Sequence, residues 1–470
     1  MRAGVARQRV SRPGRSPNDL DRALHDALRV IDGWLEYQRE LHRVPGLSAA
    51  VTYNSRRVFE RAYGDAVRQA RRRRRVTPTT CYRIASISKV FTATAVMQLA
   101  ERRIVRLDDR VQRYLPWFRA RRGASLDAIT IRQLLSHTAG VARDGTDHWS
   151  SDRFPTIVDL QAYAREGLAV YAPLERWKYS NVGYAILGQV VAAASGRPYE
   201  EQVRAAILAP LRLAHTGFAL TPAVLGTLAT GYGRAFGDRA RQPFAHPDAR
   251  GLRAAAGLVS NARDLCTFMS AQFPGSGLLL DDLSKREMQQ PHWPRGDDGH
   301  YGLGYHIWSV DDRAIVGHGG GFQGFRTAIG MDPERRIGVA VLTNAIDGPA
   351  GALMTGVFQT IHDCLTRFRV PGTAPPALRR YEGRYAGRWG DLEVAAVGGC
   401  LVGYDPGEAR PLGRASALEA RGTARFQIVD GPGGGNVGEM ATFEMNARGV
   451  PTGLRWGPNP MRRVQRSSTA

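Results

Sequence analysis

The feature that most constrains the fold is a segment from Ser86 to Ile104 that is apolar on most of its sides. It reads SISKVFTATAVMQLAERRI, in which every charged residue except Lys89 lies near the end. The composition is that of a helix, and a helix that is apolar nearly all round must be enclosed by other elements. The segment therefore predicts a globular domain built around one buried helix.

Predicted strands lie early and late in the first 370 residues, with predicted helices between them. Strands are expected at 46–53 and 57–63, joined by a turn at Asn54-Ser55, and again at 313–316, 325–331 and 337–343. Helices are expected at about 20–42, 86–104, 131–135, 183–195, 262–271 and 349–368. This order predicts an α+β domain whose antiparallel sheet pairs its N- and C-terminal segments and is flanked by helices.

The rest of the chain has a different pattern. Residues 1–18 are polar and basic and are expected to be disordered, so the main domain is placed at 19–369. Residues 370–378 (VPGTAPPAL) are rich in proline and small residues and predict a linker. Short alternating runs separated by glycines follow, and they predict a small antiparallel β-barrel at 379–470. The predicted strands are YEGRYAG, LEVAAVGGCLVGY, ARFQIVD, ATFEMN and GLRWG.

The net charge of +22 suits a nucleic-acid-binding protein, but its distribution does not. Only three residues are lysines, and the arginines are scattered along the chain. We attribute them to a bias in base composition and expect no nucleic-acid partner. The one cluster, Arg71–Arg75, is expected in a solvated loop, with an anion contact as the alternative.

Membrane, metal and disulfide chemistry find little support in the sequence. No run approaches 18 apolar residues, so no membrane span is expected. No apolar run follows the basic N-terminus, so we expect no secretory signal and a cytoplasmic protein. Cys81, Cys266, Cys364 and Cys400 are far apart and are expected as free thiols. No cofactor is expected either.

The sharpest chemical motif is Ser86-Ile87-Ser88-Lys89, at the start of the buried helix. Its spacing places Ser86 and Lys89 one helical turn apart on the same face. Burial depresses the pKa of a lysine, so that its neutral amine accepts a proton. With backbone N–H groups beside it, a serine at a helix N-terminus suits acyl transfer. With only three lysines in the chain, the motif rarely arises by chance.

Two further motifs are weak in isolation. Tyr179-Ser180-Asn181 offers a phenol that relays protons and an amide that orients a carbonyl, although such a triplet is also typical of a helix N-cap. The run from His318 to Gly321 (HGGG) follows a predicted strand, where small residues let a substrate backbone approach the sheet edge.

Together, in this order, the motifs resemble the serine β-lactamase and penicillin-binding-protein-like superfamily. The resemblance is strongest to its class C β-lactamases, D-amino-acid-specific peptidases and related esterases. It covers about residues 25–365 and includes CYRIASISKVFTATAVMQL, ITIRQLLSHTAG, ERWKYSNVGYAILGQVV and GHGGGFQGF. The C-terminal segment resembles the lipocalin-like barrels that many members carry.

The resemblance implies a role for each matching residue. Ser86 matches the nucleophile that is acylated, and Lys89 matches its general base, which acts with Tyr179. Asn181 matches the residue that contacts the substrate amide. His318 and Gly320 match the two ends of the family's Lys-Thr-Gly element. The resemblance also implies that the N–H groups of Ser86 and Gly321 form the oxyanion hole.

One departure concerns His318, because members that hydrolyse penicillin usually have lysine there. Histidine is mostly neutral at pH 7, so weak β-lactamase activity is expected. Arg326 on the next strand is the candidate cation for a substrate carboxylate, with a solvated strand residue as the alternative. His137, in LLSHTAG, is expected as a hydrogen-bonded core histidine.

Three hypotheses follow. The first is a serine hydrolase that forms an acyl-enzyme at Ser86 with an ester or a D-amino-acid-containing peptide. The second keeps the acyl-enzyme but passes the acyl group to an amine, as in peptide cyclases of the penicillin-binding-protein type. The third is a binding or sensor module that does not turn over. In each case the partner is a small molecule or a peptide.

Overall fold

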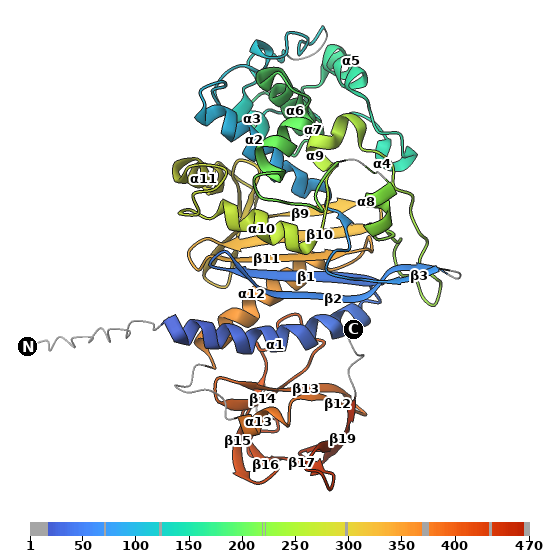
Figure 1. Ribbon diagram of the computed structural model, residues 1–470, viewed down its shortest axis with the longest axis vertical. Coiled ribbons are helices and arrows are strands. Elements are labelled where there is room, and N and C mark those ends of the chain that lie inside the picture. The colour runs from blue at the N-terminus through green and yellow to red at the C-terminus, as the bar shows by residue number, and fades with distance from the viewer. Residues whose placement is uncertain are drawn as a thin grey trace, which may run out of the picture. The chain divides into compact units, whose positions relative to one another are not determined.

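The computed structural model describes residues 17–69, 72–121, 125–218, 220, 222–296, 299–368, 376–431 and 435–464 (Figure 1). The chain forms two compact units, one of residues 35–358 and the other of residues up to Trp34 together with those from Gln359 onward. Helices α1, Pro17–Leu41, and α12, Ala350–Thr366, each contain one boundary between the units. Of the start predicted to be disordered, 1–18, residues 1–16 lie outside the described residues, as does most of the predicted linker, whereas residues 17 and 18 belong to α1 and correct the prediction there.

A nine-stranded antiparallel sheet forms the middle of the unit 35–358 (Figure 1). Its strands are β1 Gly46–Tyr53, β2 Arg56–Gln69, β3 Arg72–Arg75, β6 Trp293–Pro294, β7 His300–Tyr301, β8 His306–Val310, β9 Arg313–Phe322, β10 Phe325–Asp332 and β11 Ile337–Thr343. Their order is β3-β2-β1-β11-β10-β9-β8-β7-β6. β1 pairs with β11 from Leu47 opposite Thr343 to Tyr53 opposite Ile337, which confirms the predicted pairing of early and late segments.

Helices cover both faces of this sheet, and every residue of β11 is buried. On one face, α10, Ala262–Gln272, contacts β1 and β11. On the other face α12 approaches β10, where a Cβ at Gly330 would lie 2.9 Å from the Met354 sulfur. Burial from two sides explains why the strand IGVAVLT is apolar throughout.

The predicted enclosed helix is confirmed as α2, Ser88–Glu101. Every residue from Ser88 to Leu99 is buried. The preceding turn is a 3₁₀ helix, η1, Ala85–Ile87, so Ser86 lies just before the α-helix itself. Ala85 has a φ of 50°, a left-handed conformation that costs energy for a residue with a side chain. The chain is therefore strained directly beside the candidate nucleophile.

The remaining helices of this unit include four that contact α2, namely α6, α7, α9 and α11. The remaining helices are α3 Ile131–Leu135, α4 His148–Ser151, α5 Ile157–Gly167, α6 Asn181–Ser195, α7 Tyr199–Val203, α8 Pro222–Thr227, α9 Arg253–Ala256 and α11 Asp282–Gln289. A separate two-stranded ladder joins β4, Tyr82–Arg83, to β5, Val259–Ser260. The helices predicted at 131–135, 183–195 and 262–271 are confirmed to within two residues.

Two predictions for this unit were wrong. The strand predicted at 313–316 continues to Phe322 as β9, so the HGGG run at 318–321 lies within the strand rather than after it. Residues 72–75 of the arginine cluster form strand β3 at the edge of the sheet rather than a loop. β2 continues to Gln69, six residues beyond its predicted end, and pairs with β3 from Asp65 opposite Arg75 to Gln69 opposite Arg72. These arginines are mostly exposed. Charged residues on an edge strand discourage pairing with another chain, which explains why such a sequence forms a strand.

The second unit contains a closed antiparallel barrel, which confirms the predicted architecture. Helix α13, Pro376–Arg379, precedes its strands β12 Gly383–Gly387, β13 Gly390–Val397, β14 Cys400–Tyr404, β15 Ser416–Gly422, β16 Arg425–Asp430, β17 Met440–Met445, β18 Pro451–Trp456 and β19 Asn459–Val464. Each strand pairs with the next, and β12 pairs with β19 to close the barrel. Large buried side chains fill its interior, including Tyr381, Tyr385, Phe426, Phe443 and Trp456.

Candidate active site

Ser86 and Lys89 are in direct contact. The Lys89 Nζ lies 3.1 Å from the Ser86 Oγ. It also lies 2.8 Å from the Asn181 Oδ1 and 3.0 Å from the carbonyl oxygen of Ala255 on α9. Lys89 is fully buried, and this loss of hydration holds its pKa well below the ordinary value. The arrangement places an amine whose neutral form is favoured by burial within proton-transfer distance of a serine hydroxyl.

Two charged neighbours act on Lys89 in opposite directions. Asp144 raises the pKa of Lys89, and Arg143 lowers it. Asp144 is held in place because it accepts hydrogen bonds from the Asn181 Nδ2 at 2.6 Å and from the Trp149 Nε1 at 3.0 Å. The amide oxygen of Asn181 thus accepts a hydrogen bond from Lys89, and its amide nitrogen donates one to Asp144.

Tyr179 lies over the same lysine, with the Lys89 Nζ 4.8 Å from the centre of the phenol ring. Burial raises the pKa of Tyr179 to about 12, and a hydrogen bond with Ser86 opposes this shift. Ser180 caps α6, because its Oγ accepts from the Gly183 N–H at 2.8 Å. The triplet therefore contains both an N-cap and two residues that contact Lys89 or Ser86.

His318 on β9 is buried beside this group. Desolvation and, to a smaller extent, the nearby Lys89 lower the pKa of His318 to about 3. Its Nδ1 lies 2.6 Å from the Gly319 carbonyl oxygen and its Nε2 lies 3.3 Å from the Tyr301 hydroxyl. His137 is also buried, and its Nδ1 accepts from the Ser180 N–H at 3.1 Å, as expected of a core histidine. Both imidazoles are neutral at physiological pH.

The glycines of β9 face in two directions. A Cβ at Gly320 would lie 2.2 Å from the Ile84 carbonyl oxygen and 2.3 Å from the Thr327 Oγ1. Only glycine therefore lets β9 pack against the backbone that leads into Ser86. Gly319 and Gly321 line the adjacent pocket, and Gly320 does not.

These residues meet at a pocket of about 500 Å³. Its lining is Ser86, Arg143, Asp144, Trp149, Trp177, Tyr179, Asn181, Arg295, His306, His318, Gly319, Gly321 and Arg326. The pocket therefore brings together six of the residues predicted from sequence, namely Ser86, Tyr179, Asn181, His318, Gly321 and Arg326. Lys89 and Gly320 do not line it: Lys89 is buried in contact with Ser86, and Gly320 packs against the Ile84 carbonyl. Arg326 keeps its predicted place on the next strand, where its Nε donates to the Ile346 carbonyl at 2.7 Å.

Several lining residues were missed by sequence reasoning. Arg143 and Asp144 follow the HTAG segment, and Trp177 lies two residues before Tyr179, so closeness in sequence to a recognised motif was the available signal. Arg295 comes from the hairpin between β6 and β7, and nothing in its sequence surroundings pointed to it. Its guanidinium lies 5.1 Å from the centre of the Trp177 ring.

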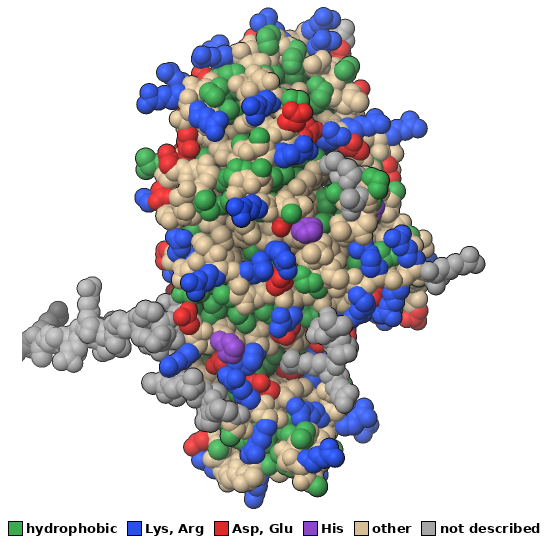
Figure 2. Space-filling view, in the orientation of Figure 1, with side chains coloured by type: hydrophobic (Ala, Val, Ile, Leu, Met, Phe, Trp, Pro, Cys, Tyr) green, Lys and Arg blue, Asp and Glu red, His purple; other side chains and the backbone are tan. Residues whose placement is uncertain are grey.

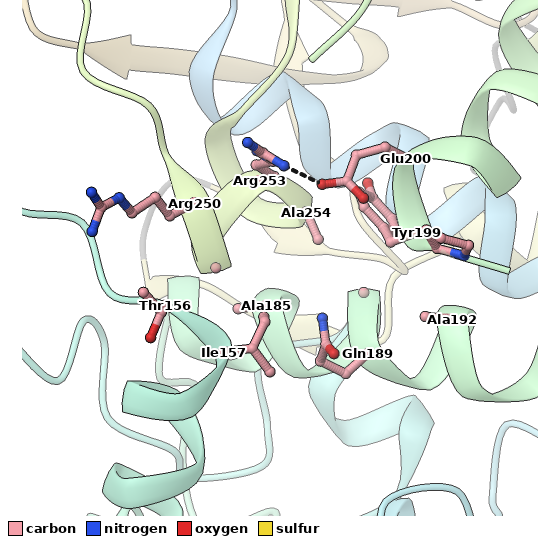
Figure 3. A pocket seen from close by; sticks show the side chains of 13 residues that line it. Thr156, Ile157, Ala185, Gln189, Ala192, Tyr199, Glu200, Arg250, Arg253 and Ala254 are labelled. Carbon is pink, nitrogen blue, oxygen red and sulfur yellow. Dashed lines mark hydrogen bonds and ion pairs between the residues drawn. The ribbon is translucent and has the colours of Figure 1, made fainter. Parts of the chain in front are cut away.

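A second cavity, of about 400 Å³, is lined by residues of α6, α7 and α9 (Figure 3). Figure 3 shows Arg253 paired with Glu200 above a floor of α6 side chains, at a distance of 2.8 Å. Ala254 lines this cavity and accepts from the Thr92 Oγ1 at 2.6 Å, whereas the next residue, Ala255, accepts from Lys89. The short helix α9 thus contributes one residue to the cavity wall and the next to the environment of the lysine.

Across the described residues, no group of three or more His, Cys, Asp or Glu side chains is arranged to hold a metal ion. The four cysteines are free thiols, of which Cys400 is half-buried and the others are buried. In the same part of the chain, no helix has the length and apolar character needed to cross a bilayer.

Comparison with known proteins identifies the family. The family model described as Beta-lactamase matches residues 31–355, so the chain belongs to this family of serine hydrolases. Among curated relatives, the protein flp of Staphylococcus aureus (strain NCTC 8325) is 26% identical over 332 residues, which are 69% of this chain and 64% of the relative. The match thus spans less than two thirds of that relative's length.

Solved structures agree with this assignment. The octameric penicillin-binding protein homologue from Pyrococcus abyssi is 25% identical, with a TM-score of 0.63 over 92% of this chain and 98% of the other. The D-amino acid amidase from Ochrobactrum anthropi SV3, complexed with D-phenylalanine, is also 25% identical, with a TM-score of 0.61 over 72% of this chain and 97% of the other. The fold and the enzyme class agree with the predictions from sequence.

Proposed function

We propose that this protein is an acyl-enzyme hydrolase that cleaves amides or esters of D-amino acids at Ser86. The observation that carries the proposal is the 3.1 Å contact between the Ser86 Oγ and the buried Lys89 amine. Burial lowers the pKa of Lys89, and the neutral form of a lysine accepts the proton that a serine hydroxyl must lose to become a nucleophile.

The reaction proceeds in two steps. In the first, the Ser86 Oγ attacks the substrate carbonyl, its proton passes to the Lys89 amine, and the C–N or C–O bond to the leaving group breaks as that group takes up a proton. Tyr179 keeps its phenolic proton at neutral pH, since its pKa is about 12, and acts as a proton relay through its hydrogen bond with Ser86. In the second step, water attacks the ester on Ser86 and the acid leaves.

The charges of the pocket favour a substrate with a carboxylate. Three arginines line it, Arg143, Arg295 and Arg326, against one carboxylate, Asp144. Arg143 pairs with Asp144 at 3.2 Å, whereas among the described residues Arg295 and Arg326 form no ion pair. His318 supplies no positive charge, because its pKa is about 3. A guanidinium binds a carboxylate through two parallel hydrogen bonds, so these two arginines take the role that a lysine has in penicillin-hydrolysing relatives.

The preference for D-residues rests on the relatives. The amidase from Ochrobactrum anthropi is named for D-amino acids and was solved with D-phenylalanine. A further structure with 25% identity and a TM-score of 0.59 is described as a D-stereospecific amidohydrolase from a Streptomyces species. Each of the two structures covers 72% of this chain.

The test compares D- and L-phenylalanine p-nitroanilides, with and without a free carboxylate on an attached residue. We expect turnover of the D-substrates, with Ser86→Ala inactive and Lys89→Ala reduced by about 10²-fold or more. Equal rates for both enantiomers would contradict the stereochemical part, and turnover by Ser86→Ala would contradict the whole assignment.

The same experiment separates hydrolysis from acyl transfer. An added amine, such as a D-amino acid amide, competes with water for the ester on Ser86, and mass spectrometry of the products measures the partition. We expect the free acid as the main product. An amide product in excess at low amine concentration would instead establish a transferase, and a stable acyl adduct without product would indicate a binding or sensor module.

A further inference from the structure

A third cavity lies at another edge of the same unit. It has a volume of about 490 Å³ and lies where the end of α1, the turn between α1 and β1, the end of β2 and the loop 232–241 meet. Its thirteen lining residues are Arg39, Glu40, Arg43, Val44, Pro45, Arg68, Tyr232, Ala235, Gly237, Asp238, Arg239, Ala240 and Arg241. None of them belongs to the Ser86 pocket.

Arginine is concentrated in this lining. The chain has 65 lysines and arginines, of which three are lysines, so 62 of its 470 residues are arginine. A lining of this size drawn at random from the chain would hold about two arginines, and this one holds five. The cavity is therefore richer in arginine than the general bias of the sequence explains.

Not all of these arginines are available to a ligand. Arg241 is buried, with 8% of its side chain exposed. It forms an ion pair with Asp347 at 2.5 Å and donates a hydrogen bond to the Gly233 carbonyl at 2.7 Å, so its charge is already used within the protein. Arg39 pairs with Glu40 at 2.8 Å. These pairs hold the loop and the turn in place, and they leave the charges of the other arginines to define the cavity.

Arg43, Arg68 and Arg239 supply the available charge. Arg68 and Arg239 are exposed, and neither forms an ion pair with any described residue. Arg43 pairs with Asp238, but the distance to the carboxylate oxygen is long, at 3.9 Å, and the Asp238 side chain is fully exposed. The cavity thus presents two or three guanidinium groups, with one solvated carboxylate opposing them.

Strand β3 extends this positive charge beyond the cavity. Arg73 lies opposite Arg68 in the β2–β3 ladder, and Arg75 is close enough to lower the pKa of Arg39. Arg73 and Arg75 share a single carboxylate oxygen, that of Asp65, at 2.9 and 3.2 Å. In Figure 2, lysine and arginine side chains gather at the side of the molecule where Figure 1 places β3.

We propose that this cavity binds a phosphate group carried on a larger molecule. Guanidinium forks match phosphate oxygens in geometry, and several of them together suit a group with more than one negative charge. Phe236 next to the cavity is 70% exposed and stacks against Arg239, with the guanidinium 5.8 Å from the ring centre. An apolar side chain beside the cations suits a phosphate attached to an organic body, either a phospholipid or a soluble phosphate ester.

The experiment measures binding of two probes to the full-length protein at low and at moderate salt. Isothermal titration with inorganic pyrophosphate reports a soluble ligand. Flotation with phosphatidylcholine vesicles, with and without phosphatidylglycerol, reports a lipid headgroup. We expect binding to at least one phosphate probe, weakened by salt because the attraction is electrostatic.

The deciding variant is Arg68→Ala with Arg239→Ala. We expect it to lose at least about tenfold in affinity for the bound probe, since two charge-assisted contacts are removed. The matched control is Arg102→Ala with Arg204→Ala, which removes the same charge at two exposed positions outside the cavity. The variants should keep the thermal midpoint and the labelling of Ser86, which makes this test independent of the proposed enzyme activity.

Each outcome decides the proposal. Binding of pyrophosphate alone identifies a soluble ester, binding of phosphatidylglycerol vesicles alone identifies a headgroup, and either supports the site when the deciding variant loses it. No binding to either probe, or equal loss in the control variant, overturns it. Binding of a single-stranded oligonucleotide that pyrophosphate does not displace would also overturn it and would indicate a nucleic-acid surface.

Discussion

The amide group of Asn181 bridges Lys89 and Asp144. Its oxygen lies 2.8 Å from the Lys89 Nζ and its nitrogen lies 2.6 Å from the Asp144 Oδ1. A neutral side chain therefore separates the catalytic amine from the nearest carboxylate and keeps the two from forming a direct ion pair. This separation lets burial dominate and keep the pKa of Lys89 low.

The two charged neighbours of Lys89 predict opposite shifts in the pH profile. The rate of acylation rises with pH through the pKa of Lys89, because only the neutral amine accepts a proton. Asp144 raises that pKa, so Asp144→Asn should move the acid limb to lower pH by about 0.3–1 pH unit. The measurement is kcat/KM as a function of pH.

Arg143→Gln provides the complementary prediction. Arg143 lowers the pKa of Lys89, so its removal should move the acid limb of the same profile to higher pH. Arg143 is largely exposed, with 63% of its side chain accessible, so the expected shift is smaller than that of Asp144→Asn. Shifts in the same direction for both variants would show that Lys89 does not control the limb.

His318 predicts a dependence of stability on pH. Its pKa is about 3 in the folded protein and 6.5 as an ordinary value, so the unfolded chain takes up a proton that the folded protein excludes. The stability that His318 contributes is complete above about pH 6.5 and is lost as pH falls toward 3, at about 1.4 kcal/mol per pH unit. His318→Gln should therefore flatten the fall in the free energy of unfolding.

The measurement is urea denaturation of both proteins at several pH values between 7 and 4. His137 is also buried and His306 is half-buried, and desolvation lowers the pKa of each, so the variant should keep part of the slope. Parallel curves for the wild type and His318→Gln would mean that His318 takes up its proton in the folded state.

The two neighbouring glycines of β9 predict different costs for one added methyl group. Gly320→Ala places a Cβ 2.2 Å from the Ile84 carbonyl oxygen, so we expect a loss of about 1–3 kcal/mol in stability and slower labelling of Ser86. Gly319→Ala meets its nearest atom at 3.8 Å, so its stability should stay within about 0.5 kcal/mol of wild type. Equal thermal midpoints for the two variants would rule out this packing role.

Arg326 predicts selectivity for substrates with a free carboxylate. Arg326→Gln removes a guanidinium from the pocket wall and should raise KM about tenfold for D-peptides that end in a carboxylate, with little change in kcat. The matching amidated peptides are the control, because they carry no charge for Arg326 to bind. A similar rise in KM for both series would assign Arg326 a structural role.

The central sheet and the site motifs could be predicted from the sequence because each has a local signal, either an apolar run or a fixed spacing. Strand 337–343 was predicted to its exact ends, because a strand buried on both faces is a continuous apolar run between polar turns. The contact of Ser86 with Lys89 follows from their spacing in one helical turn, and it needs no knowledge of the rest of the fold.

The elements that were missed lack such local signals. The barrel strands β15, SALEARG, and β19, NPMRRV, are largely exposed, so neither shows the alternation that marks a strand. β3 consists of four arginines and is a strand because β2 is there to pair with it. Arg295 reaches the pocket from a hairpin more than 200 residues beyond Ser86, and only the tertiary fold brings it there.

The most direct test of the central claim is the intact mass of the protein after treatment with a fluorophosphonate probe. We predict a single adduct on the wild type, none on Ser86→Ala, and slower labelling of Lys89→Ala, because the lysine removes the proton from the attacking serine. An adduct on folded Ser86→Ala, or no adduct on folded wild type, would contradict the assignment of Ser86 as the nucleophile.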